Sequence, residues 1–196
     1  PVILAKAGKN AAEIRGSKRA HHRDGAAMVE FLCWLKKAVP KGGVTELSAA
    51  RKLEETRKCR SRFRGLSFAT ISAYRGHAAI VHYAVSPESD APLKPKGIYL
   101  VDSGSQYLDA TTDITRTVCL GSPTTEQQDN YTRVLKGVIS LSRTSFPKGT
   151  SGPQLDVLAR HALWEKGLNY GHGTGHGIGS FLNVHEGPQG IAPARG

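Results

Sequence analysis

Two aspartates eleven residues apart, Asp102 and Asp113, are the first side chains in this sequence that could do chemistry. Each adjoins an apolar, β-branched run typical of a strand. The turn-forming residues between them allow a hairpin with both carboxylates on adjacent strands, their Cβ atoms about 5 Å apart if directly opposed. Carboxylates that close repel each other and lose solvation, so they share a proton or bind a cation. The sequence does not fix the pairing, and two exposed aspartates on a solvated sheet face are the alternative.

A glycine-rich stretch, GHGTGHGIG at 171–179, has glycine at every second position. This period predicts an extended strand with the glycines on one face and His172 and His176 on the other. Four residues of strand span about 13 Å, so the two histidines cannot easily bind one ion. We expect one to be a metal ligand and the other to meet substrate or to support a ligand from outside the coordination sphere. A structural glycine-rich turn is the alternative, and the spacing fits neither GxGxxG nor HExxH.

Two further histidines, His82 and His185, end apolar runs that resemble strands. Each alone would be read as structural, but beside Asp102, Asp113 and His176 they would line a site that needs neutral bases. Carboxylate and imidazole ligands favour Mn, Co, Fe or Zn. A bridging carboxylate would place two ions about 3.5–4 Å apart, an arrangement that hydrolyses amides and esters. The sequence has no GxSxG, P-loop or Cys/His protease signature to indicate covalent catalysis.

The elements that must position these residues follow an α+β order with an antiparallel sheet. Asn10 and Glu13 form a capping box before a helix over 11–38, and Thr45 caps a second helix over 46–62. A third helix is predicted over 125–143 and a fourth from Ser151 to about Lys166. The predicted strands are 66–73, 78–83, 98–101 and 114–120.

The composition is that of a globular chain, with 196 residues of which 39% are hydrophobic. It has no apolar stretch of the roughly 20 residues that a membrane span needs. Three cysteines without a CxxC motif favour a reducing, cytoplasmic setting. Because the first residue is Pro1, we expect the chain to be part of a longer protein.

The net charge of +11 lies entirely within residues 1–75 and is densest over 51–64. An anionic partner such as nucleic acid is one interpretation. A solvated helix face, or a surface that meets an acidic region elsewhere, is the other. We favour the second and do not expect nucleic-acid binding, because no aromatic stacking platform or nucleic-acid-binding motif accompanies the charge.

Together, these residues resemble the pita-bread metallopeptidases, and more narrowly the Xaa-Pro aminopeptidases (aminopeptidase P) of the cytosolic and bacterial long form. The resemblance covers nearly the whole chain. Its matching segments are LSFATIS (66–72), IVHYA (80–84), YLVDSGSQYLDATTDITRTV (99–118) and GHGTGHGIGSFLNVHEGP (171–188), together with the first helix, 9–35. The last two of the four motifs are the most specific.

The resemblance implies a pita-bread fold, a curved antiparallel sheet with flanking helices, of which this chain is an incomplete part. It implies that Asp102 is a terminal ligand of one metal, Asp113 a bridging ligand and His176 a ligand of the other. His82, His172 and His185 would bind the peptide, shuttle protons and stabilise the tetrahedral intermediate. A hydroxide bridging two divalent ions, usually Mn²⁺ with Zn²⁺ or Co²⁺ as alternatives, would release an N-terminal residue that precedes proline. The implied partners are such peptides and no membrane; a homodimer is among the expected states of the parent protein.

One departure from the family pattern concerns the ligand count. The family uses five ligands, and the two glutamates, one of them the general acid/base, lie downstream of 188. Residues 1–196 are therefore expected to be a partial catalytic domain that lacks preceding domains and is inactive alone. Two alternatives stay open: a non-catalytic pita-bread module that binds peptides or nucleic acid, and a sibling enzyme such as prolidase, creatinase or methionine aminopeptidase.

Overall fold

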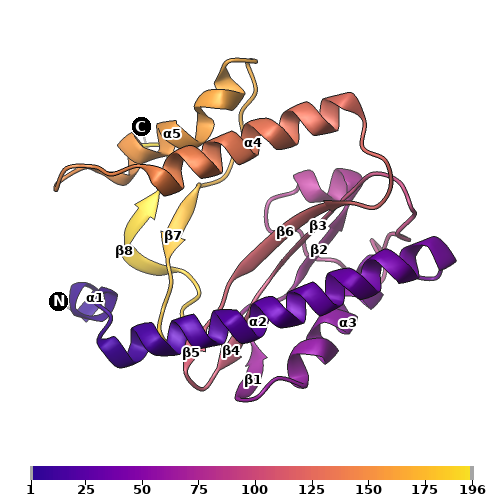
Figure 1. Cartoon of the computed structure of the whole chain (residues 1–196), viewed down its shortest axis with the longest axis horizontal. Helices are drawn as coiled ribbons and strands as arrows, with labels where there is room; N and C mark the ends of the chain where they lie inside the picture. The colour runs from indigo at the N-terminus through magenta and orange to yellow at the C-terminus, as the bar shows by residue number, and fades with distance from the viewer. Residues whose placement is uncertain (1, 195–196) are drawn as a thin grey trace. The chain divides into compact units, whose positions relative to one another are not determined.

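The computed structural model describes residues 2–194, which form two compact units (Figure 1). The first unit contains the chain up to 122 and also 178–185, and the second contains 123–177 and the residues from 186 onward. The chain therefore crosses between the units three times. None of the helices within 2–194 combines the length and the apolar character needed to cross a membrane.

The first unit begins with helices α1 (Val2–Ala7), α2 (Ala11–Ala38) and α3 (Glu46–Lys58), and a 3₁₀ turn, η1 (Val39–Lys41), precedes α3. The predicted capping box of α2 is confirmed, because Asn10 accepts from the backbone N–H of Glu13 while Glu13 accepts from that of Asn10. The predicted bounds of α2 are confirmed as well. Helix α3 is four residues shorter than expected, and the chain turns away through Arg62, which has a φ of 68°.

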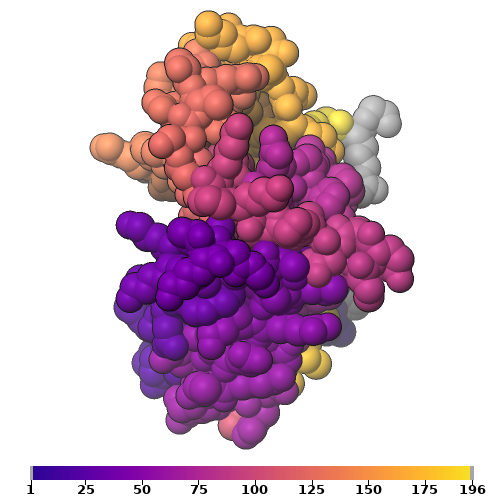
Figure 2. Space-filling view, turned by 90° about the vertical axis from the view of Figure 1, so that its right-hand side faces the viewer, coloured from indigo at the N-terminus to yellow at the C-terminus, as the bar shows by residue number. Residues whose placement is uncertain are grey.

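Two antiparallel three-stranded sheets complete the first unit. One has the order β2 (Ile71–Tyr74), β3 (Ile98–Ser103), β6 (Ile114–Cys119), and the other β1 (Phe63–Leu66), β4 (Ser105–Tyr107), β5 (Ala110–Thr111). The core lies between α2, α3 and the first sheet, and its fully buried side chains include Phe31, Leu53, Tyr99 and Val101. In the space-filling view, the indigo to magenta residues of this unit form one continuous surface (Figure 2).

The returning segment 178–185 pairs with the second of these sheets. The backbone N–H of Thr111 donates to the Ser180 carbonyl at 3.1 Å, and that of Leu182 donates to Gln106 Oε1 at 3.0 Å. The Thr111 hydroxyl also donates to the Leu182 carbonyl. The short strands β4 and β5 thus obtain partners from a segment that lies some seventy residues later in the sequence.

Two of the predicted strands in this unit are wrong. The strand over 66–73 is divided, since β1 ends at Leu66 and β2 begins at Ile71. Residues 78–83 form no strand; a 3₁₀ helix, η2 (Arg75–Ala79), is followed by a turn in which Tyr83 N–H donates to the Ile80 carbonyl. The φ of His82 in this turn is 55°, a left-handed conformation that a strand does not accommodate.

The second unit pairs helices α4 (Thr125–Arg143) and α5 (Gly152–Trp164) with a hairpin of β7 (Gly175–Gly177) and β8 (Glu186–Ile191). The bounds of α4 match the prediction, and α5 ends two residues early. At Gly137 the helices approach so closely that a Cβ would lie 2.1 Å from the Ala159 carbonyl oxygen. The predicted strand over 171–179 is confirmed only at 175–177; residues 171, 172 and 174 lie in bends.

Candidate metal centre and its surroundings

Of the two candidate carboxylates, Asp102 lies on β3 and Asp113 directly precedes β6, the antiparallel neighbour of β3. In the register of β3 and β6, Asp102 faces Thr115 and Ser103 faces Ile114. The sequence left the pairing open, and this register does not put the two carboxylates directly opposite each other. Asp113 precedes β6 by one residue and Thr115 by two, so strand alternation places it on the same face as Thr115 and Asp102. The Thr115 hydroxyl donates to Asp102 Oδ1 at 2.7 Å, and the two aspartates are diagonal neighbours.

The buried carboxylate of Asp24 binds the segment that connects Asp102 to Asp113 in the sequence. Asp24 of α2 is 0% exposed and forms a two-bond ion pair with the equally buried Arg57 of α3. Its remaining donors are the hydroxyls of Ser105, Tyr107 and Thr112, at 3.2, 3.0 and 2.7 Å. Because Thr112 directly precedes Asp113, this carboxylate fixes the backbone from which the second candidate ligand projects.

Tyr107 remains a neutral donor to that carboxylate over a wide pH range. Its burial and the neighbouring charge of Asp24 raise its pKa to about 12. Sequence reasoning missed both Asp24 and Arg57. The only signal was an aspartate inside the buried stripe of α2, and a surface aspartate would give the same signal.

A second buried carboxylate, Glu46, holds the segment that carries His82. Glu46 is the first residue of α3 and is 0% exposed. It accepts four hydrogen bonds, from Tyr74 N–H (2.5 Å), His77 Nδ1 (3.0 Å), Tyr83 Oη (3.1 Å) and Ala91 N–H (3.2 Å). Burial raises the pKa of Tyr83, which keeps this donor protonated. His82 is thus an exposed side chain on a turn that is anchored from both sides.

The structure brings two of the predicted histidines together within the first unit. The rings of His82 and His185 have centroids 6.4 Å apart and are tilted by 39°. Both side chains are exposed, and neither ends a strand. Their proximity is compatible with a shared contact to one substrate, as the resemblance implies.

The other two histidines, His172 and His176, lie in the second unit, with His176 on β7 opposite Gly190. Each Nδ1 lies 2.8 Å from the carbonyl oxygen of the following glycine, Gly173 or Gly177. Since a carbonyl only accepts, Nδ1 is the donor in both contacts, and the neutral tautomer that donates from Nδ1 leaves the lone pair on Nε2. This tautomer suits an imidazole that ligates through Nε2.

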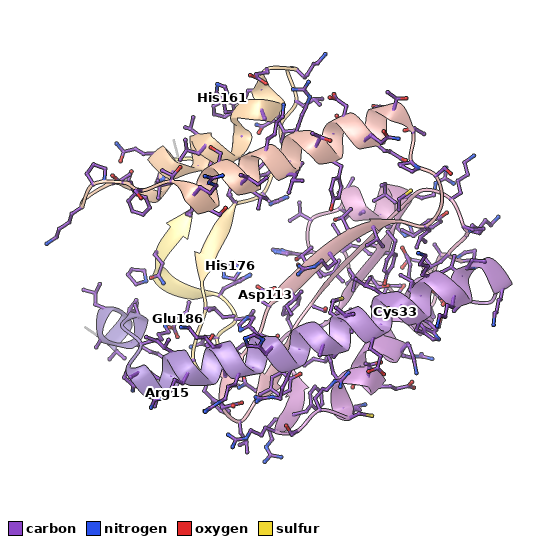
Figure 3. All side chains as sticks on the ribbon, in the orientation of Figure 1. Arg15, Cys33, Asp113, His161, His176 and Glu186 are labelled. Atoms are coloured by element: carbon purple, nitrogen blue, oxygen red, sulfur yellow. The ribbon has the colours of Figure 1, made fainter. Side chains whose placement is uncertain are left out.

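The donor types fit divalent ions of the Mn, Co or Zn kind, with two carboxylates on one sheet face and an imidazole in the Nε2 form. Figure 3 labels Asp113 at the start of β6 and His176 on β7. Across the described residues 2–194, no group of three or more His, Cys, Asp or Glu side chains is arranged to hold a metal ion. The three-residue ligand set therefore stays a prediction.

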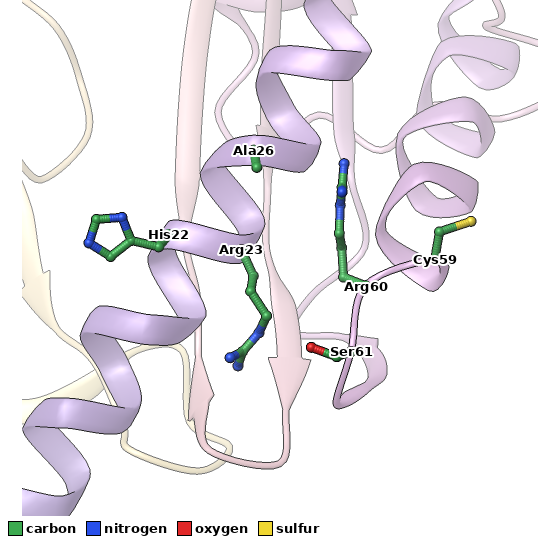
Figure 4. Close-up of a pocket in the computed structure, with 6 residues that line it drawn as sticks. All are labelled: His22, Arg23, Ala26, Cys59, Arg60 and Ser61. Carbon is green, nitrogen blue, oxygen red and sulfur yellow. The ribbon is translucent and has the colours of Figure 1, made fainter.

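The basic stretch 51–64 is extensively ion-paired within the first unit. Five of its seven basic side chains lie within 4.0 Å of a carboxylate: Lys52, Arg57, Lys58, Arg60 and Arg62. A surface pocket beside this stretch is lined by His22, Arg23, Ala26, Cys59, Arg60 and Ser61 (Figure 4). Both of its arginines are bound to acids, Arg23 to Asp109 and Arg60 to Glu30.

Comparison with known proteins identifies the family of this chain. Residues 15–196 match the model of the family described as Metallopeptidase family M24. The chain belongs to metallopeptidase family M24. It is 55% identical over 192 residues to a probable Xaa-Pro aminopeptidase P of Tuber melanosporum, covering 97% of this chain and 31% of the relative. It is 47% identical to aminopeptidase P1 of Arabidopsis thaliana, covering 98% of this chain and 33% of that protein.

Solved M24 structures agree. The X-prolyl aminopeptidase of Caenorhabditis elegans, described as a cytosolic enzyme with a di-nuclear active site, superposes with a TM-score of 0.92 at 46% identity, over 100% of this chain and 32% of that one. The prolidase of Pyrococcus furiosus gives a TM-score of 0.82 at 27% identity, over 97% and 53%. The predicted α+β, pita-bread fold is confirmed. The chain spans about a third of the length of its curated M24 relatives.

Proposed function

We propose that these residues belong to the catalytic domain of a metal-dependent Xaa-Pro aminopeptidase, which hydrolyses the bond between an N-terminal residue and a following proline. The observation that supports this proposal is the register of β3 and β6, in which Asp102 is opposite Thr115 and Asp113 directly precedes β6. Two divalent ions, with Mn²⁺ as the first choice, would offset the mutual repulsion of the two carboxylates. The names of the M24 relatives support the substrate class.

In this proposal Asp102, Asp113 and His176 hold the ions. When bound, two ions supply Lewis acidity to the scissile carbonyl and lower the pKa of a water. His82 and His185 orient the peptide from the first unit. His172 presents its Nε2 to the substrate, where an imidazole can bind a carbonyl or move a proton at neutral pH.

The proposal also covers the cellular location, the oligomeric state and the part of the catalytic domain that these residues form. The description of the Caenorhabditis elegans relative as cytosolic supports a cytosolic location, and a homodimeric parent is part of the proposal. We also propose that residues 1–196 alone are a partial catalytic domain with little turnover, because the family resemblance assigns two further glutamate ligands outside them.

The test is an assay of the full-length protein containing these residues, with Mn²⁺ added, on a tripeptide and a dipeptide that both have proline second. We expect release of the first residue from the tripeptide, loss of release on chelation, and activity below detection for Asp113→Asn. The matched control is Asp129→Asn, which removes an exposed carboxylate paired with Arg133 on α4.

Three outcomes would contradict the proposal. Cleavage of the dipeptide alone would assign the protein to the prolidases. Activity that survives Asp113→Asn would show that the reaction does not need a site with two carboxylates. Salt-sensitive binding of nucleic acid without any peptidase activity would favour the non-catalytic module, which the charge of residues 1–75 suggests.

A further inference from the structure

A single guanidinium lies beneath the irregular loop that carries His172. Residues 169–174 have no regular secondary structure, and among the bonds described only Thr174 at their end bonds a strand, its N–H donating to the Ile191 carbonyl of β8 at 2.8 Å. Arg160 of α5 is 1% exposed and is among the largest fully buried side chains of the described chain. A buried arginine is costly unless every donor has a partner, so its contacts show what it is there to bind.

The donors of Arg160 are directed mainly at this loop. Nη1 donates to the Tyr170 carbonyl at 2.5 Å and to Asn169 Oδ1 at 2.8 Å. Nη2 donates to the carbonyl of His172 at 2.7 Å. Nε donates at 2.6 Å to Asp156, one helical turn earlier in α5, which supplies the compensating charge. Three acceptors in four consecutive residues therefore bond one planar side chain, and one of them, Asn169 Oδ1, also accepts from Trp164 Nε1 at 3.4 Å.

An aromatic ring extends this contact to the imidazole. The guanidinium carbon of Arg160 lies 3.8 Å from the centroid of the Tyr170 ring, and that ring lies 4.8 Å from the ring of His172 at an angle of 34°. The far side of the loop is held by Thr174, whose hydroxyl contacts Tyr170 Oη at 2.5 Å and donates to Asp156. Backbone and ring of His172 are thus fixed through the same ion pair.

We propose that Arg160 is the positioning residue for His172: through its bond to the His172 carbonyl and its stack on Tyr170, it holds that imidazole in the orientation that substrate requires. This rests on the proposed role of His172 in peptide hydrolysis. Lysine cannot replace arginine here, because an ammonium lacks the planar fork that reaches several acceptors and stacks on a ring. The methylene groups that a lysine shares with Arg160 would not orient the loop by themselves.

The test compares Arg160→Lys with Arg133→Lys in the full-length protein. Arg133 is the matched control, since its Nη1 bonds a helix carbonyl, that of Ala162, and its Nε bonds Asp129, with no contact to the loop. Amide hydrogen exchange of the metal-free protein is measured first. We expect exchange in 169–174 to rise at least tenfold in Arg160→Lys and to stay at the wild-type rate in Arg133→Lys.

Steady-state kinetics of the variants are the second measurement. We expect Arg160→Lys to lower kcat/KM by about tenfold to a hundredfold and to shift kcat and KM in the same directions as His172→Ala. In the double variant, Arg160→Lys should add almost nothing to His172→Ala, because the two residues act as one unit. Tyr170→Leu, which leaves the Arg160–Asp156 pair intact, should give a smaller loss of the same kind and serves if Arg160→Lys does not fold.

Two results would overturn the positioning role: wild-type exchange of the loop in Arg160→Lys, or effects of Arg160→Lys and His172→Ala that multiply in full. An inactive wild-type protein would instead reject the proposed function, while the exchange measurement still decides whether Arg160 orders the loop. The two failures are therefore distinguishable.

Discussion

At the scale of single residues, a neighbouring hydroxyl orients the proposed ligand Asp102. The Thr115 hydroxyl donates to Asp102 Oδ1 at 2.7 Å and so selects one orientation of the carboxylate. Groups that orient a ligand in this way contribute about tenfold to a hundredfold to metal affinity or activity. Thr115 is exposed, so its hydroxyl contributes little to folding.

We therefore expect Thr115→Val to raise the Kd for Mn²⁺ of the full-length protein about tenfold or more, with the melting temperature unchanged. Manganese titration followed by calorimetry or electron paramagnetic resonance measures this. Thr117→Val, two residues along β6 and opposite Leu100, is the control and should bind as wild type. Equal affinities for both variants would show that the hydroxyl does not orient a ligand.

Residue chemistry was more predictable than residue environment. The types and spacing of Asp102, Asp113 and the histidines indicated a metal site before any fold was known. Asp24, Glu46 and Arg160 gave no comparable signal, because a charged residue in a helix looks the same whether it is solvated or buried. Most of their partners lie 9 to 88 residues away, and the tertiary fold brings them near.

At the scale of elements, capping chemistry was reliable and strand patterns were not. Asn10 and Thr45 cap their helices as predicted, through local bonds that are legible in four residues, and Thr124 caps α4 in the same way. Residues 78–83 have a strand-like composition, yet Glu46 binds Tyr83 and His77 and stabilises a turn there. The alternating glycines of 171–179 likewise do not produce a long strand, since Arg160 binds the loop carbonyls that a partner strand would need.

The contact between α4 and α5 gives a prediction at this scale. In an exposed helix, Gly→Ala stabilises by about 0.5–1 kcal/mol. At Gly137 the added Cβ would meet the Ala159 carbonyl oxygen at 2.1 Å, so we expect Gly137→Ala to destabilise by about 1–3 kcal/mol instead. Urea unfolding measures the change. Ser140→Ala, on an exposed position of the same helix, should be near neutral. A stabilised Gly137→Ala variant would refute this close packing.

At the scale of the whole molecule, buried phenols set an alkaline limit on stability. Burial raises the pKa of Tyr99, Tyr107 and Tyr83 above the ordinary 10.0, and that of Tyr107 reaches about 12. A folded-state pKa above the unfolded one means that the stabilisation is complete below pH 10 and is lost as pH rises through 12. Because the unfolded chain ionises these phenols at their ordinary pKa and the folded chain does not, high pH favours the unfolded state.

We therefore expect the free energy of unfolding to be nearly constant from pH 8 to 10 and to fall steeply above pH 10. Urea titrations at half-unit intervals measure this slope. Tyr107→Phe should make the decline shallower, whereas Tyr131→Phe, whose ring is 52% exposed, should leave it unchanged. A decline that is identical in both variants would assign the alkaline limit to other groups.

The three crossings of the chain between its two units have a consequence for biosynthesis. The partners that Ser180 and Leu182 provide for β4 and β5 are translated only after the whole of 123–177. At roughly 5–20 residues per second, the ribosome needs about 3–12 s to make the residues between 122 and 185. During that interval the nascent first unit presents Gln106 and Thr111 without their native partners, so a chaperone that recognises unfinished sheet edges would find its substrate there.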